Sequence, residues 1–410
     1  MIRLKKTLNI IHKMASKHLP IMNDKDFVEN ADEGGDDEAQ SNFGGVSYSG
    51  YNVNKDNKSA FKCCRKAAED GDAKAQNNLG DIYYKGQGVI KDYNEAFKWY
   101  RKATEQGNAD AQYNLAMMYY KGEGVVKSYK EASELIRKAA EHGCANAQFN
   151  LGQRYIRGEG VEKDPKGAVN WFRKAAEQGH ADAEYNLAMI YYDKGVINEY
   201  EEASKLIRNA AEQGHPKAQI ILAESYHRGE EVNKDYKEAF KWYQKAAEQG
   251  KAVAQYNLAN MYYLGEGVRK RYKEAVTWYR KAAEQGDEIA QFNLGGMYYR
   301  GEGVIKDYKE SVKWYEKSAE QGFAKAQFNL GCMYQKGKGL AKDKKEAAKW
   351  IKKAAVQGNV RAQFALATMY YKGKGVSKDH NESVKWYRKA AEQGHAKAQA
   401  ILYELGKLHA

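Results

Sequence analysis

The sequence predicts an all-α protein, a right-handed superhelix (solenoid) of about ten helix-turn-helix repeats of 36 residues. A Glu-Gln-Gly motif or a near variant recurs along the chain, with its glycine at Gly71, Gly107, Gly143, Gly179, Gly214, Gly250, Gly286, Gly322, Gly358 and Gly394. The spacing is 36 residues at every step except from 179 to 214, where it is 35. Each segment contains two stretches with apolar residues at helical spacing. Because two short helices cannot bury their apolar faces alone, neighbouring repeats must stack.

The periodicity divides the chain into three parts. Residues 1–34 precede the repeats and are predicted to be flexible, first basic and then acidic. Residues 35–394 are predicted to form the ten repeats, the first of them degenerate. Residues 395–410 are predicted to form a C-terminal capping helix.

The composition narrows the class of protein. With 43% apolar and 30% charged residues, the 410-residue chain is too apolar for a disordered protein and too long for one ordinary domain. No segment approaches eighteen consecutive apolar residues, so no membrane-spanning helix is expected. Four cysteines cannot form a dense disulfide framework, and they fit a reducing compartment. We therefore expect a cytoplasmic protein, with delivery to a host cell or an organelle left open.

The first residues allow three interpretations. Residues 1–23 contain no acid, and their longest apolar run, Ile10-Ile11, is too short for a secretory signal. The segment is compatible with a basic amphipathic helix that touches an anionic membrane, with an organelle presequence, or with a translation start at Met14 or Met22.

The first helix of each repeat is illustrated by residues 74–85. Ala75, Leu79, Ile82 and Tyr83 recur at helical spacing and predict a face turned to the core. Positions 77, 80 and 84 are expected to pack against the neighbouring repeat. The remaining positions, 74, 78, 81 and 85, follow the spacing i, i+4, i+7 and i+11 and are our candidate for the concave surface of the solenoid.

The second helix is expected between Asp92 and Gly107. Asp92 and Glu95 form a capping-box pattern. The pattern recurs at Ser128/Glu131, Asp235/Glu238, Asp307/Glu310, Asp343/Glu346 and Asp379/Glu382. The predicted buried stripe of this helix is Ala96, Trp99, Tyr100 and Ala103. Gly107 is free to take the left-handed conformation that ends helices.

All seven tryptophans stand at one repeat position, namely Trp99, Trp171, Trp242, Trp278, Trp314, Trp350 and Trp386. Other repeats have Cys63, Leu135 and Leu206 there, so we expect a core position that needs apolar volume and not a ligand-stacking ring. The loop Gly86-Gln87-Gly88-Val89 looks superficially like a phosphate-binding loop. Because no strand precedes it and it recurs in nearly every repeat, we interpret it as a turn.

These motifs resemble the Sel-1-like repeat family, a relative of the tetratricopeptide repeats. The similarity is carried by Ala-Ala-Glu-Gln-Gly-His-Ala-Lys-Ala-Gln-Ala at 390–400, and by Leu-Gly-x-x-Tyr and Gly-x-Gly-Val-x-Lys-Asp within 79–92. The resemblance implies a protein-interaction scaffold, since family members act as adaptors in signalling, in membrane-protein turnover and in bacterial contact with host cells. It implies no catalytic residues and no cofactor.

One branch of this family is rich in paired cysteines and is associated with penicillin binding. The resemblance therefore leaves open a penicillin-binding or β-lactamase-like enzyme as an alternative. The chain departs from that branch, because its cysteines fall at four different repeat positions, Cys63, Cys64, Cys144 and Cys332. Ser59-Ala60-Phe61-Lys62 matches Ser-x-x-Lys, a match that a lysine-rich chain should contain by chance. The nine histidines show no metal-ligand spacing, so we expect neither catalysis nor a metal.

Asparagine dominates position 78 of the candidate surface. It occurs as Asn78, Asn114, Asn150, Asn186, Asn257, Asn293 and Asn329. A row of amides can donate to and accept from the backbone of an extended peptide. The alternative is an inherited residue on a solvated face. The recurring Gln76, Gln112, Gln148 and Gln255 lie closer to the core and are expected to satisfy buried backbone groups.

The net charge of +13 is concentrated near the C-terminus. Residues 36–322 hold 43 basic and 43 acidic side chains, whereas residues 323–410 hold 18 basic and 6 acidic ones. On the candidate surface this excess places Lys325, Lys336, Arg361, Lys372 and Lys397. Such a patch favours an acidic or phosphorylated protein segment or an anionic membrane surface, unless it is only a solvated face. Nucleic acid is not expected, because no base-stacking aromatic accompanies the lysines. The oligomeric state is not indicated.

The repeat rules break in mid-chain. Between Asp193 and Glu231 one loop is shortened, Glu231 replaces a turn glycine and Ile221 replaces the recurring asparagine. We interpret this as a bend, as a docking site or as drift in a redundant array.

Overall fold

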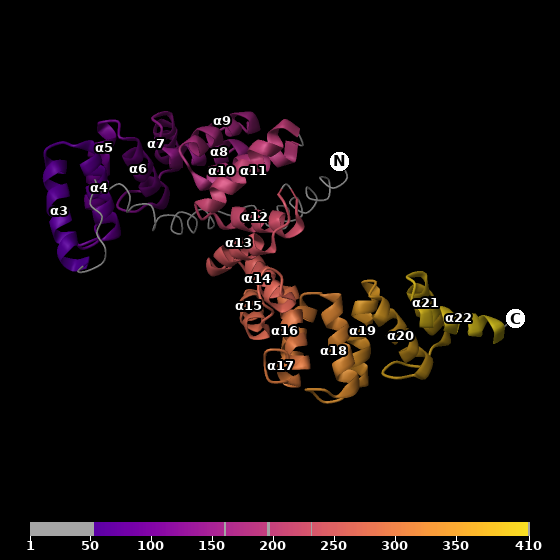
Figure 1. Ribbon diagram of the computed structural model, residues 1–410. Helices are drawn as coiled ribbons and strands as arrows, with labels where there is room; N and C mark the ends of the chain where they lie inside the picture. The colour runs from indigo at the N-terminus through magenta and orange to yellow at the C-terminus, as the bar shows by residue number, and fades with distance from the viewer. Residues whose placement is uncertain (1–52, 160, 195–196, 231, 409–410) are drawn as a thin grey trace. The chain divides into compact units, whose positions relative to one another are not determined.

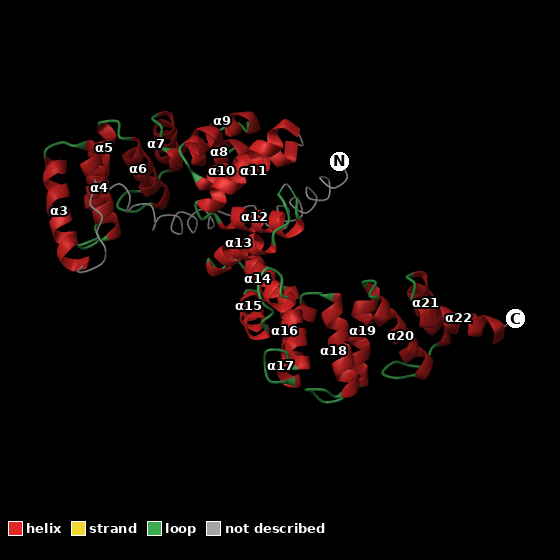
Figure 2. Ribbon diagram, viewed as in Figure 1, coloured by secondary structure: helices red, strands yellow, loops and turns green. Residues whose placement is uncertain are grey.

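The computed structural model describes residues 53–159, 161–194, 197–230 and 232–408, and all regular structure in them is helical (Figures 1 and 2). Twenty helices and no strand occur in these residues, which confirms the all-α repeat fold. The predicted flexible segment 1–34 lies outside them, as do Gly195, Val196 and Glu231.

The chain divides into two compact units, 1–215 and 216–410. The N-terminal unit contains α3 (Val53–Glu69), α4 (Ala73–Lys85), α5 (Tyr93–Glu105), α6 (Ala109–Lys121), α7 (Tyr129–Glu141), α8 (Ala145–Arg157), α9 (Pro165–Glu177), α10 (Ala181–Lys194) and α11 (Ile197–Glu212). The C-terminal unit contains α12 (Pro216–Arg228), α13 (Tyr236–Glu248), α14 (Ala252–Leu264), α15 (Tyr272–Glu284), α16 (Glu288–Arg300), α17 (Tyr308–Glu320), α18 (Ala324–Lys336), α19 (Lys344–Val356), α20 (Val360–Lys372), α21 (His380–Glu392) and α22 (Ala396–Leu408). Within each unit, successive helices pack on one another as a stack of hairpins (Figure 1).

The predicted helix ends are confirmed, but the capping boxes are half formed. The Asp92 carboxylate accepts hydrogen bonds from the backbone N–H groups of Asn94 and Glu95. Its own N–H donates to the Tyr83 carbonyl, so Glu95 does not return the bond and pairs with Lys98 at 2.6 Å instead. The aspartates at 235, 307, 343 and 379 also cap through their side chains, whereas Ser128 does not. Gly107 has φ 80°, in the left-handed region, as expected.

Position 80 was expected to face the neighbouring repeat, and this expectation is wrong. Gly80 packs against the second helix of its own repeat, where an added Cβ would lie 2.5 Å from the Tyr100 ring. Gly331 faces Ile351 in the same way. A small residue is needed here because the two helices of a hairpin approach closely.

The tryptophan position is less buried than expected. Trp242, Trp314 and Trp386 are buried, but the other four are only half-buried. The fully packed position is the next one, which holds Tyr100, Ile136, Phe172, Ile207, Tyr243, Tyr279, Tyr315, Ile351 and Tyr387. Each tryptophan is covered by the ammonium group of the lysine three residues later, as Lys281 covers Trp278 at 4.0 Å from the ring centroid. The lysine stem and charge shield the ring face that the neighbouring helices leave open.

A ladder of buried glutamines joins successive helices. Gln76 donates to the Ala68 carbonyl of the preceding helix at 3.1 Å, and its own carbonyl accepts from Gln106 at 2.8 Å. The second contact recurs at Gln178/Gln148, Gln249/Gln219, Gln285/Gln255, Gln321/Gln291, Gln357/Gln327 and Gln393/Gln363. The predicted role is confirmed for Gln76, Gln148 and Gln255, each of which donates to a backbone carbonyl eight residues earlier.

The shortened repeat has longer helices. Its helices α10 and α11 have 14 and 16 residues, whereas α8 and α9 have 13 each. Two residues, 195–196, lie between them, whereas seven, 158–164, lie between α8 and α9, so positions that connect the helices elsewhere belong to the helices here.

Candidate binding surface

The candidate surface is a stripe on the first helix of each repeat, at the positions equivalent to 74, 78, 81 and 85. We call it the binding stripe. In α18 its residues are Lys325, Asn329, Cys332 and Lys336. The first and last of these are exposed and the middle two are half-buried, a pattern that α12 and α20 share, whereas in α14 the first one is half-buried as well. The stripe is therefore accessible at both edges and shallowly buried along its centre.

The asparagines of the stripe lie between successive repeats. Asn114 donates to the side-chain oxygens of Asn77 at 3.0 Å and Asp81 at 3.3 Å, both in the preceding repeat. Asn150 is buried and donates to the Tyr113 hydroxyl at 3.1 Å.

In the C-terminal unit the amides reach a second helix instead of a first one, because Asn293 and Asn329 hydrogen-bond to Tyr279 on α15 and Tyr315 on α17. Asn186 differs, because it donates to the Asp182 carbonyl of its own helix. These amides thus have a packing role that periodicity did not reveal.

The five predicted cations come together in the C-terminal unit. Lys325 and Lys336 lie on α18, Arg361 and Lys372 on α20, and Lys397 on α22. All five side chains are exposed. None has a carboxylate oxygen within 4.0 Å among the residues that the structure describes. Three successive first helices therefore present cations that lack a paired carboxylate among the described residues, although the stripe of α22 also carries the exposed Glu404.

The preceding helices of the stripe carry apolar residues that sequence reasoning overlooked. Leu264 ends α14 with 55% of its surface exposed, and Ile289 begins α16 with 36% exposed. Val253, at the start of α14, is half-buried. A comparison of the repeats position by position would have identified them, because most other repeats have a charged residue at these places.

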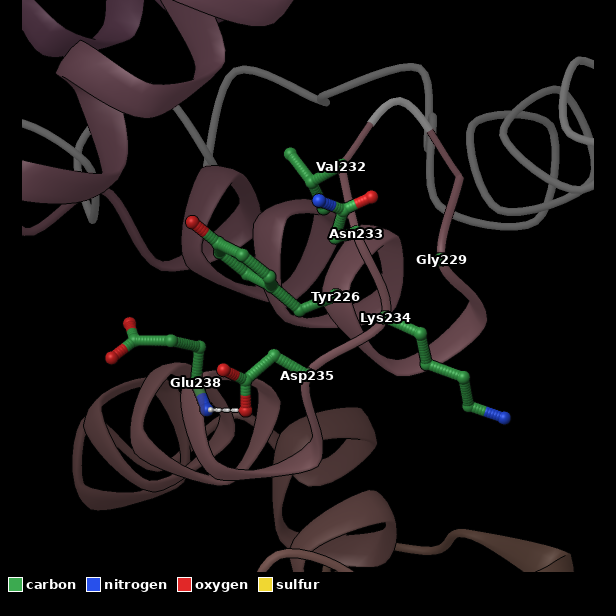
Figure 3. A pocket seen from close by; sticks show the side chains of 7 residues that line it. All are labelled: Tyr226, Gly229, Val232, Asn233, Lys234, Asp235 and Glu238. Atoms are coloured by element: carbon green, nitrogen blue, oxygen red, sulfur yellow. Dashed lines mark hydrogen bonds between the residues drawn. The ribbon is translucent and has the colours of Figure 1, made fainter.

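Two open hollows lie in the C-terminal unit, and neither brings together an arrangement of side chains typical of a catalytic site. One of about 770 Å³ lies beside the loop between α12 and α13, and Tyr226, Asp235 and Glu238 line it while Lys234 points away (Figure 3). Another of about 440 Å³ contains Lys325 of the stripe together with Glu288 and Phe323.

The described residues contain no group of three potential metal ligands. All four cysteines are free thiols. Ser59 of the Ser-x-x-Lys match lies on α3, but its side chain is outside the described ones. No described helix has the length and hydrophobicity needed to cross a membrane.

A protein-family model described as Sel1 repeat matches the chain ten times, at residues 37–72, 73–108, 109–144, 145–180, 181–215, 216–251, 252–287, 289–323, 324–359 and 360–395. The chain belongs to the Sel1-repeat family. Sel1-repeat solenoids are generally protein–protein interaction scaffolds, and the family is typically non-enzymatic.

Solved structures of Sel1-repeat proteins are similar to this one. A protective antigen of uropathogenic Escherichia coli with this repeat fold is 37% identical, with a TM-score of 0.67 over 84% of this chain and 82% of that one. A Sel1 repeat protein from Oxalobacter formigenes is 34% identical, with a TM-score of 0.52 over 75% of this chain and 90% of that one. The search of curated proteins found no match.

Proposed function

We propose that this Sel1-repeat protein is a scaffold that holds a partner protein segment along the binding stripe, with a preference for acidic segments near the C-terminus. The observation that carries the proposal is the set of exposed, unpaired cations on α18, α20 and α22. Over residues 36–322 basic and acidic side chains balance, so the excess of positive charge lies in residues 323–410, the part of the chain that contains these helices.

The physical basis is electrostatic steering with modest energies. Exposed ion pairs contribute roughly 0–1 kcal/mol each, so several must act together to give a useful affinity. They are screened over about 8 Å at physiological ionic strength, so binding should weaken as salt is added. The shallow centre of the stripe leaves the asparagine carbonyl oxygens as further acceptors for a peptide backbone.

The test compares two charge-reversed proteins that have the same net charge. In the first, Lys325, Lys336, Arg361, Lys372 and Lys397 are changed to Glu. In the control, five exposed cations of second helices are changed to Glu, namely Lys237, Lys309, Lys345, Lys352 and Arg388. The probe is a labelled peptide of about 15 residues, rich in Asp and Glu, followed by fluorescence anisotropy at several salt concentrations.

We expect the stripe variant to bind the peptide at least tenfold more weakly than the control, with unchanged circular dichroism. An equal loss in both variants would show that net charge, and not the stripe, attracts the peptide.

The same cations favour a second candidate function, an adaptor at an anionic membrane surface. Sedimentation with vesicles of acidic or of neutral lipid separates the two functions. If the protein sediments with acidic vesicles and does not bind the acidic peptide, the membrane adaptor replaces the proposed scaffold that binds protein segments.

A further inference from the structure

The binding stripe of the C-terminal unit changes character along its length. At the position of Leu264, four other first helices of this unit have a cation, namely Arg228, Arg300, Lys336 and Lys372, and α22 has Leu408, whose side chain is outside the described ones. At the position of Ile289, all the other first helices of this unit except α14 have a cation, namely Lys217, Lys325, Arg361 and Lys397. The apolar residues thus occupy α14 and α16, and the unpaired cations occupy α18, α20 and α22 (Figure 1).

Packing within the solenoid does not require these apolar side chains. The same helices pack in the same way in other repeats, where a charged residue stands at the equivalent place. Leu264 and Ile289 keep 55% and 36% of their surface exposed. Covering this exposed apolar surface with another apolar surface would lower the free energy, so a ligand with apolar side chains is favoured here.

The apolar part of the stripe, on α14 and α16, and the cationic part, on α18, α20 and α22, lie close enough for one ligand to cover both. Arg300 at the end of α16 donates to the Tyr263 hydroxyl of α14, so successive first helices are neighbours. Packed helices are roughly 10 Å apart, and an extended chain spans about 3.3 Å per residue. The four spacings between the five helices from α14 to α22 therefore take about 12 residues of ligand. Leu264 and Ile289 lie at opposite ends of the stripe, about 16 Å apart along the helix axis, so the ligand must run obliquely from α14 to α16, and its length becomes about 15 residues.

We propose that this stripe binds one extended protein segment of about 15 residues with two blocks, apolar side chains over α14 and α16 and acidic side chains over α18, α20 and α22. The inference rests on the proposed function and specifies its partner. Charge complementarity assigns the acidic block, and the exposed apolar residues assign the other.

The test uses the full chain and four labelled peptides, namely an acidic block alone, an apolar block alone and the two blocks joined in either order. The stripe variant is Leu264→Gln with Ile289→Gln. The matched control is Ile305→Gln with Val356→Gln, which removes two apolar residues that are 91% and 68% exposed and lie off the stripe. Glutamine adds no charge and favours helices, so both variants should keep the circular dichroism of the parent.

We expect at least one joined peptide to bind more tightly than the acidic block alone. The stripe variant should weaken that peptide about tenfold and leave binding of the acidic block unchanged, because covering part of two aliphatic side chains is worth about that factor. The control should change binding less than twofold.

Two results would overturn the inference. If the joined peptides bind no better than the acidic block, and that block still depends on the stripe cations, the two-block partner is wrong and the proposed function survives. If no peptide binds, the acidic preference in the proposed function fails as well.

Discussion

Glu184 is the one described member of the glutamine ladder that carries a carboxyl group. It is only 4% exposed, and burial raises the pKa of its carboxyl to about 6, although Asn209 and Gln213 hydrogen-bond to it. Gln213 donates to it at 2.8 Å. An ionised carboxylate has no proton to donate to the backbone carbonyl that Gln76 and its equivalents reach. Above its pKa, this side chain therefore weakens the ladder.

We predict that Glu184→Gln stabilises the protein by about 1 kcal/mol at pH 7.5, because it restores the missing donor. The folded-state pKa lies above the ordinary value near 4.5. The parent protein should therefore be stabilised by this group at pH 4.5 and lose that contribution as the pH rises through 6. Urea unfolding of both proteins at pH 5 and 7.5 measures the difference. The control is Glu177→Gln, at an exposed position. An equal gain in stability for that variant would contradict the role of the missing donor at position 184.

Trp314 shows what the tryptophan position requires. It lies in one buried cluster with Tyr279 of the preceding repeat and with Leu294 and Met297 of its own repeat. We predict that Trp314→Ala lowers the free energy of unfolding by about 3 kcal/mol, and that Trp314→Leu lowers it by only about 1 kcal/mol, because leucine serves at the same position at 135 and 206. Lys317→Gln, which removes the cation 4.5 Å from the ring, should cost less than about 1 kcal/mol. Equal losses for the alanine and leucine variants would mean that the ring itself is needed.

At the scale of the helix pair, the small residue at position 80 sets the spacing. A Cβ on Gly331 would lie 2.6 Å from Ile351 Cγ1 and 3.0 Å from the Ala347 carbonyl oxygen. We predict that Gly331→Leu lowers the free energy of unfolding by about 2–3 kcal/mol through overpacking. Gly331→Ala should be nearly neutral, because alanine gains about 1 kcal/mol of helix propensity and occupies the equivalent, fully buried positions 259 and 367. Urea unfolding tests both, and a neutral leucine variant would contradict the close approach.

The sequence predicted the positions of the helices, but it predicted only some of the contacts between them. Caps such as Asp92 and turns such as Gly107 depend on a few adjacent residues, so local patterns predicted them. Whether Trp99 or Tyr100 is the better buried depends on the angle at which the next repeat crosses the helix, which periodicity does not specify. The Asn114 contact with Asn77 depends in the same way on the distance between first helices. The sequence predicted the cations of the stripe because they form a local excess of charge. It did not single out Leu264, because single exposed leucines are common on protein surfaces.

At the scale of the whole molecule, contacts between neighbours should make single repeats interchangeable. Helix α15 packs on α16, and the buried cluster that they share contains Ala290, Leu294 and Met297 of α16. Helix α18 presents the same residue types in the same register, Ala326, Leu330 and Met333. A chain lacking residues 288–323 would bring α15 against α18 with its interface unchanged in kind. It would also place Asp287, now the N-cap of α16, before α18, whose own N-cap Phe323 makes no side-chain hydrogen bond.

We predict that the protein lacking 288–323 folds, keeps its helical content per residue and unfolds cooperatively, because each interface involves only neighbouring helices. A deletion of equal length that begins mid-helix, residues 294–329, joins the first part of α16 to the last part of α18 in the same register, so it should also fold. A deletion of residues 288–305 instead fuses α15 to α17 without a first helix between them, and it should lose helicity and stability together. Circular dichroism and urea unfolding compare the three. If the 36-residue deletions unfold as readily as the 18-residue one, stability does not come from interchangeable neighbour contacts.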